Sequence, residues 1–196
     1  MNDQFTAEDL AALSTLVADT WTAGADLDWT VPAGTVEWSC LKTADHAVDC
    51  VYAPAFFLAS RNTDAYPVAG ANLELGDLAT PALLVESLRM ATRIVIAVVN
   101  HAPPDTRAIL FQRPQPNPPL GRPTDFLPRA AMELILHAHD VCRGLAVAFE
   151  PPPDLCRRLR EHTRTWLMWT SFGHGLGMTA DPFGDLLSAS GRSRPD

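Results

Sequence analysis

Two short stretches of the sequence carry ionisable side chains at helical spacing, and the first is AMELILHAHDVCRG, residues 131–144. Within it, Glu133 and His137 are four residues apart and Asp140 follows three residues later. These three side chains share one stripe of a helix, because residues three and four apart are neighbours on its surface. Arg129 lies one turn before Glu133 on the same stripe. An ion pair on a solvated helix face is therefore the simplest alternative to a site.

The second stretch, WSCLKTADHAVDC, places His46 at the edge of a face of small and apolar residues. A histidine in such a place is usually a packed core or boundary residue. Combined with Glu133 and His137 on another helix, however, it completes a set of two imidazoles and one carboxylate. Three such ligands leave a fourth tetrahedral position open, as in catalytic zinc sites, where water or a thiol can bind.

The spacing therefore predicts a divalent metal site with His46, Glu133 and His137 as its ligands. Iron, nickel and manganese use the same residue types, and zinc is favoured if the fourth ligand is sulfur. Asp140, one turn beyond His137, is the predicted catalytic carboxylate, which orients a ligand or handles a proton. The alternative for Asp140 is a solvated residue near the end of the helix.

Long helices are needed to position these residues. Capping residues and apolar spacing predict helices over about 6–24, 39–61, 80–102, 124–144 and 151–172, followed by one short helix in the tail. Pro54 falls inside the second helix and removes one backbone hydrogen bond. The proline-rich residues 103–123 form a long connection in which RAILFQ can be extended. The predicted architecture is all-α, a single domain over 1–190 built as a four-helix bundle with an additional C-terminal helix, and a disordered tail over 191–196.

Composition restricts the partners. The chain has 196 residues, 47% of them hydrophobic, with a formal charge of -8 and no Lys/Arg run, which argues against nucleic acid and anionic membranes. No apolar block reaches bilayer length, so we expect a soluble cytoplasmic protein. The four cysteines show no CxxC spacing and are expected to be reduced thiols. Fourteen arginines against one lysine indicate a GC-rich genome.

Both stretches also resemble a known family. WSCLKTADHAVDCVYAPAFFLA, with Trp38 eight residues before His46, and MELILHAHDVCRGL resemble the two motif segments of DinB-like bundles. More closely, they resemble the N-terminal domain of the mycothiol-dependent maleylpyruvate isomerase family, and DPFGDLLSASGR is similar to the tails of that group. The resemblance implies an up-down-down-up four-helix bundle that holds a metal, usually zinc, through His46, Glu133 and His137. The family's isomerase has a further C-terminal domain, and this chain is too short to be expected to contain one.

The function predicted from these observations is a metal-dependent S-transferase or isomerase. It would use mycothiol or another small thiol as cosubstrate, and a metal-bound thiolate would attack an electrophilic small molecule. A zinc-hydroxide hydrolase is one alternative. A bundle that binds a small molecule or a partner without catalysis is another. The expected partners are the substrate and the thiol, and a homodimer is compatible with the sequence. The glycine-rich FGHGLG at 172–177 is expected to be a loop.

Overall fold

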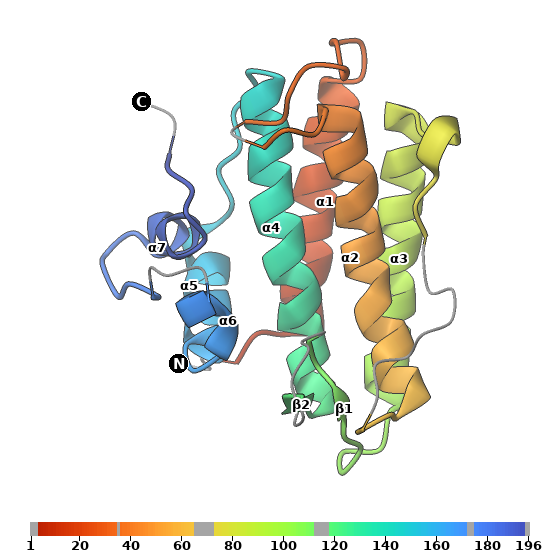
Figure 1. The fold of residues 1–196 in the computed structure, drawn as a ribbon, viewed down its shortest axis with the longest axis vertical. Coiled ribbons are helices and arrows are strands. Elements are labelled where there is room, and N and C mark those ends of the chain that lie inside the picture. Colours follow the sequence, from red (N-terminus) through yellow and green to blue (C-terminus); the bar gives the residue numbers. More distant parts are fainter. Residues whose placement is uncertain (1–3, 35, 65–72, 112–117, 172–174, 195–196) are drawn as a thin grey trace.

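Four long helices form the body of the protein (Figure 1). They are α1 (Ala7–Ala23), α2 (Cys40–Ser60), α3 (Pro81–His101) and α4 (Phe126–Gly144). The computed structural model describes residues 4–34, 36–64, 73–111, 118–171 and 175–194. The chain is mostly helical, which confirms the predicted all-α class.

The helices begin where the capping residues predict. Thr6 accepts a hydrogen bond from the Asp9 amide while the Asp9 carboxylate accepts one from the Thr6 amide, which forms a capping box at the start of α1. Ser39 caps α2, and Thr80 caps α3 with Pro81 at its first position. These side chains satisfy amide groups that have no partner within the helix.

Helices α2 and α4 make the most extensive contact among the described elements, and α2 also packs against α3. Helix α1 closes the bundle by packing against α3 and α4. In Figure 1, α1 and α4 run upward, whereas α2 and α3 run downward. Helices α2 and α3 are parallel, and the 3-10 helix η1 (Gly76–Leu78) before α3 lies beside the start of α2.

The core between the four long helices is mostly apolar, and it contains a hydrogen bond between buried hydroxyl groups of two helices. Its large buried residues include Trp21, Leu88 and Leu134. The hydroxyl oxygens of Ser14 on α1 and Thr92 on α3 are 2.8 Å apart and share a hydrogen bond. Both residues are buried, and the Thr92 hydroxyl lies 2.8 Å from the Leu88 carbonyl of its own helix as well as from the Ser14 oxygen.

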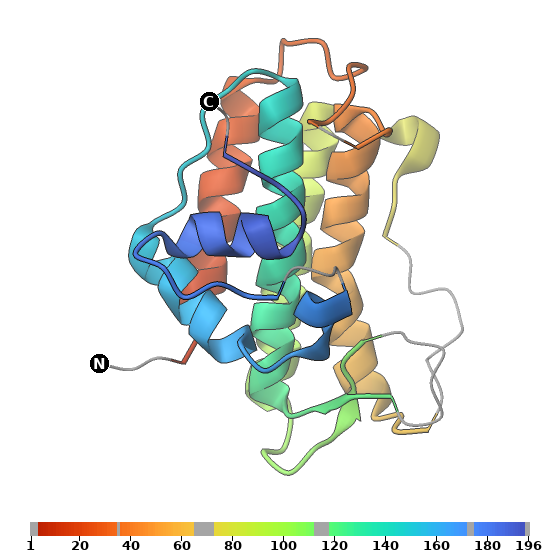
Figure 2. The same ribbon diagram turned by 60° about the vertical axis from the view of Figure 1, so that its left-hand side comes forward.

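Three shorter helices lie against the side of the bundle formed by α4 and α1 (Figure 2). The prediction of one continuous helix over 151–172 is wrong, because α5 (Pro153–Thr163) ends and α6 (Leu167–Ser171) follows after a turn. The indole of the buried Trp169 folds back and donates to the Thr163 carbonyl, which satisfies that end of α5. Helix α7 (Pro182–Ala189) is the predicted short helix of the tail and packs against α5.

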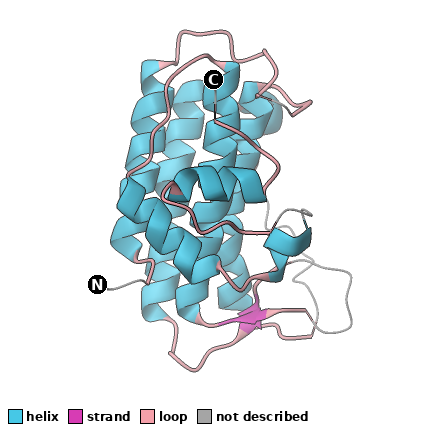
Figure 3. Ribbon diagram, turned by 90° about the vertical axis from the view of Figure 1, so that its left-hand side faces the viewer, coloured by secondary structure: helices cyan, strands magenta, loops and turns pink. Residues whose placement is uncertain are grey.

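The proline-rich connection contains a two-stranded antiparallel ladder, β1 (Ala108–Ile109) with β2 (Leu120–Gly121), at the end of the bundle where α4 begins (Figure 3). Within RAILFQ, Ala108 and Ile109 are therefore extended, as predicted for this stretch. The 3-10 helix η2 (Pro123–Asp125) leads directly into α4. None of the helices in the described ranges combines the length and the apolar character needed to cross a membrane.

The described part of the end of the chain, residues 191–194, makes contacts with earlier residues. Arg192 and Ser193 contact α4, and Arg194 pairs with Asp181 and Glu150. Residues 195–196 lie outside the described residues. Arg192 and Arg194 thus both form ion pairs with carboxylates of the preceding residues.

Candidate metal site

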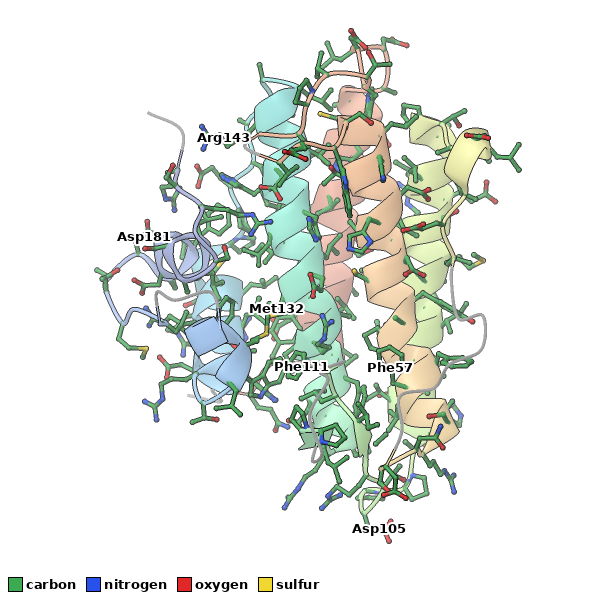
Figure 4. The ribbon with its side chains drawn as sticks, in the orientation of Figure 1. Phe57, Asp105, Phe111, Met132, Arg143 and Asp181 are labelled. Atoms are coloured by element: carbon green, nitrogen blue, oxygen red, sulfur yellow. The ribbon has the colours of Figure 1, made fainter. Side chains whose placement is uncertain are left out.

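Helices α2 and α4 bring His46 and His137 face to edge. The centroids of the two imidazole rings are 5.2 Å apart and their planes meet at 75°. His137 lies on the part of α4 between Met132 and Arg143, which Figure 4 labels. The two helices that the site requires are therefore neighbours, and their histidines meet across the interface.

His137 has a carboxylate beside each ring nitrogen. Its Nε2 is 3.5 Å from Glu133 Oε2, and its Nδ1 is 3.4 Å from Asp140 Oδ2. The Nδ1 atom is buried and makes no hydrogen bond of good geometry with any described residue. Burial opposes protonation of His137, but the two carboxylates outweigh it and raise its pKa above the ordinary value.

Glu133 also forms an ion pair with Arg129, which is the simpler alternative considered from the sequence. Arg129 Nη1 donates to Glu133 Oε1 at 2.6 Å, and both side chains are largely buried. Burial by itself raises the pKa of Glu133. The charge of Arg129 and the contact with His137 lower it by more, so the net effect is a lowered pKa. The carboxylate is thus ionised and shared between an arginine and the candidate ligand His137.

Asp140, the predicted catalytic carboxylate, is buried and held from both oxygens by Arg192. Nε and Nη2 of Arg192 lie 2.8 Å and 2.7 Å from Oδ1 and Oδ2. Burial opposes ionisation of Asp140, but the contacts with His137 and Arg192 outweigh it and lower its pKa. Such a carboxylate is better suited to orienting His137 than to accepting a proton. Arg192 carried no signal in the sequence, because it lies 52 residues away in a polar tail.

His46 is flanked in the same way on α2. Its Nδ1 is 3.4 Å from Glu74 Oε1, and its Nε2 is 3.4 Å from Cys50 Sγ. Asp45 accepts hydrogen bonds from the amides of Leu75 and Gly76, which ties the segment that carries Glu74 to α2. The sequence did not reveal Glu74 as a neighbour of the site, because nothing in its own stretch predicts where the connection crosses α2.

A pocket of about 440 Å³ opens above the two histidines. Val36, Glu37, Trp38, Thr43, His46 and His137 line it. The Trp38 ring packs edge-on against His46 with centroids 5.2 Å apart. Thr43 is fully buried and its hydroxyl has no hydrogen-bond partner among the described residues, so the pocket offers a polar contact that the protein itself does not use.

A larger depression of about 660 Å³ lies elsewhere, where α1 begins and α3 ends. Its lining includes Phe5, Asn100 and Arg122 but none of the candidate ligands. Size alone therefore does not identify the site. The pocket of about 440 Å³ is singled out because two of the candidate ligands, His46 and His137, line it.

The donor types fit a divalent metal, although the side chains do not stand in ligating positions. Across the described ranges, no three His, Cys, Asp or Glu side chains form a group ready to hold an ion. Two imidazoles and an ionised carboxylate nevertheless come from facing helices. Glu133 Oε2 lies 3.5 Å from His137 Nε2, while Glu133 Oε1 accepts a hydrogen bond from Arg129.

The remaining histidines lie apart from the pocket. His139 faces the tail, 3.0 Å from the Ser193 carbonyl, and His162 lies 3.0 Å from Asp125. His101 contacts the Ala97 carbonyl of its own helix. His174 and the start of the glycine-rich loop lie outside the described residues.

Comparison with known proteins identifies no family for the chain. No family model matches it, and neither the curated proteins nor the solved structures contain a match.

Proposed function

We propose that the pocket between α2 and α4 binds a divalent metal, with zinc favoured, through His46, Glu133 and His137. We further propose that the protein is a thiol-dependent S-transferase or isomerase that acts on an electrophilic small molecule. The observation that carries the proposal is the meeting of the two imidazoles below a pocket, with Glu133 Oε2 3.5 Å from His137 Nε2. The resemblance to the mycothiol-dependent, DinB-like bundles supports the choice of a small thiol such as mycothiol.

When bound, such a metal supplies a Lewis acid that lowers the pKa of a thiol in its open position. The protein's own residues position the reactants. Glu74 and Asp140 lie beside the Nδ1 atoms of His46 and His137, so the Nε2 atoms are the ones that would ligate the metal. The Trp38 ring covers an apolar wall of the pocket, and the unpaired Thr43 hydroxyl provides a hydrogen-bonding group for the small molecule.

Metal analysis of the purified protein tests this proposal. We expect about one zinc per chain, and we expect His46→Ala and Glu133→Gln to lose most of it, because three ligands are the minimum of a catalytic zinc site. His101→Ala is the matched control, since His101 is an exposed histidine on another helix. Equal metal content in His46→Ala and the unaltered protein would remove His46 from the site.

Activity is tested next, by incubating the zinc-loaded protein with a small thiol and an electrophile and following thiol consumption or isomerisation. Turnover that needs the thiol supports the transferase or isomerase. Turnover of an ester or amide in thiol-free buffer would instead favour a metal-hydroxide hydrolase.

One observation favours a second function, a bundle that binds a small molecule without a metal. Glu133 is already neutralised by Arg129, and the described residues hold no preformed ligand group. In that case the 440 Å³ pocket itself would be the functional site. Binding of a small molecule to metal-free protein, with no gain on adding zinc and no turnover with any thiol, would support this function.

A further inference from the structure

We propose that Cys50 is a fourth protein ligand of the metal, so that the resting site is a closed set of two imidazoles, one carboxylate and one thiolate. This inference rests on the proposed function, because it concerns the same metal. It changes the expected site, since the three-ligand set leaves one position open and the four-ligand set does not.

The first argument is the arrangement of donors on the helices. His46 and Cys50 are one turn apart on α2, and Glu133 and His137 are one turn apart on α4. Each helix therefore contributes a pair of donors from one face. The pairs face each other, because the rings of His46 and His137 are in contact across the interface.

The second argument is the distance within each pair. With Zn–N of about 2.0–2.1 Å, Zn–S of about 2.3 Å and Zn–O of about 2.0–2.2 Å at tetrahedral angles, an N···S edge is about 3.6 Å and an N···O edge about 3.4 Å. The observed distance from His46 Nε2 to Cys50 Sγ is 3.4 Å. That from His137 Nε2 to Glu133 Oε2 is 3.5 Å. Each helix thus already presents one edge of a tetrahedron.

The third argument is that both imidazoles are oriented as metal ligands are. A ligating histidine usually directs its second ring nitrogen at a carboxylate or carbonyl, which fixes the tautomer and leaves the other nitrogen for the ion. Here the Nδ1 atoms face Glu74 and Asp140, and the Nε2 atoms face Cys50 and Glu133.

An independent sign that the pocket holds something is Thr43. Its side chain is fully buried in the pocket wall, and its hydroxyl makes no hydrogen bond to any described residue. Cys50 also differs from the other cysteines, since Cys40, Cys142 and Cys156 are buried whereas Cys50 is only partly so. Cys50 does not itself line the pocket, but its Sγ lies 3.4 Å from Nε2 of His46, which does.

A closed site gives the external thiol a defined entry step. The sulfur of the incoming thiol takes the place of Cys50, and its proton passes to the departing Cys50 thiolate. One metal–sulfur bond forms as another breaks, one S–H bond breaks as another forms, and no oxidant is needed. The substrate class that suits such an exchange is a small thiol.

Cobalt titration of the full chain tests the inference, because a thiolate bound to Co²⁺ gives a charge-transfer band in the near ultraviolet that nitrogen and oxygen ligands do not. We expect the band in the unaltered protein and its loss in Cys50→Ser. Cys156→Ser is the matched control, with its thiol on α5 outside the four-helix body, and should keep the band. Removal of a ligand should weaken Co²⁺ binding by more than the roughly 10–100-fold that loss of an outer hydrogen-bond partner costs.

The outcomes separate this inference from the proposed function. Co²⁺ binding that needs His46 but gives no thiolate band would overturn the role of Cys50 and leave the three-ligand site. Absence of any Co²⁺ binding would overturn both. If Cys50→Ser does not fold, alkylation of the unaltered protein tests the same inference. Zinc should slow the labelling of Cys50 at least about tenfold. Equal labelling with and without zinc would contradict the role of Cys50 as a ligand.

Discussion

The pair formed by Arg192 and Asp140 connects the end of the chain to the candidate site, and its removal gives the sharpest prediction. Two hydrogen bonds of 2.8 Å and 2.7 Å join the guanidinium to the carboxylate. The Asp140 side chain is 2% exposed and that of Arg192 is 15% exposed. Arg192→Met removes the positive charge and leaves an ionised carboxylate in the protein interior, with the His137 ring 3.4 Å away.

The expected loss follows from that burial. Removing one partner of a buried ion pair costs about 3–5 kcal/mol, because the other charge stays buried and uncompensated. Arg192 is not fully buried and His137 remains beside Asp140, so we expect about 2–3 kcal/mol. For a chain of this size, that corresponds to a fall in melting temperature of roughly 4–12 °C. Replacing both residues, as Arg192→Met with Asp140→Leu, should cost less than the sum of the single changes, by about 2 kcal/mol.

Urea unfolding of the metal-free protein at pH 7, followed by circular dichroism, measures these free energies. Arg194→Met is the matched control, because Arg194 also pairs with two carboxylates, Asp181 and Glu150, but all three side chains are substantially exposed. Exposed pairs contribute about 0–1 kcal/mol. The reasoning is refuted if Arg192→Met is no more damaging than Arg194→Met, or if the single changes add to within about 0.5 kcal/mol.

Three further predictions concern the same helices. Arg129→Met should tighten zinc binding, measured by competition with a chelator, because Arg129 competes with the metal for Glu133; weaker binding would contradict this competition. Gly144→Ala should lower the free energy of unfolding by about 1–3 kcal/mol despite better helix propensity, because a Cβ there would overlap the sulfur of Cys40, and an unchanged urea midpoint would count against this close packing. Glu133 and Asp140 have pKa values that are lower in the folded protein than in the unfolded chain. The stability they contribute is therefore fully present above their unfolded-state pKa values of about 4, and it is lost as the pH falls toward their folded-state pKa values. The urea midpoint should therefore drop from pH 5 to pH 3, and less steeply in Glu133→Gln.

Local signals were enough to predict the four long helices. Capping residues such as Thr6, Ser39 and Thr80 act through hydrogen bonds to amides three residues away, so their effect is written in a short window of sequence. The break between α5 and α6 escaped prediction, because it depends on the Trp169 indole reaching the Thr163 carbonyl in the folded protein.

Some contacts of the candidate site could be predicted from the sequence and others could not. The stripe of Arg129, Glu133 and His137 follows from helical spacing, and the structure contains both the ion pair and the carboxylate–histidine contact that this spacing allows. Glu74 and Arg192 could not be found from the sequence. They reach the histidine and the carboxylate from a connection and a tail, and only the folded chain determines where those segments cross the bundle.

The hydroxyl pair of Ser14 and Thr92 acts as an alignment mark between α1 and α3. If one helix slid past the other by a turn, Ser14 would lose the hydrogen bond from Thr92, whereas Thr92 would keep the Leu88 carbonyl of its own helix. A buried hydroxyl left without a partner costs about 1–3 kcal/mol. Apolar side chains alone tolerate such slippage far better, because their contacts have no direction. The hydroxyl pair therefore favours one alignment of α1 with α3 along their axes.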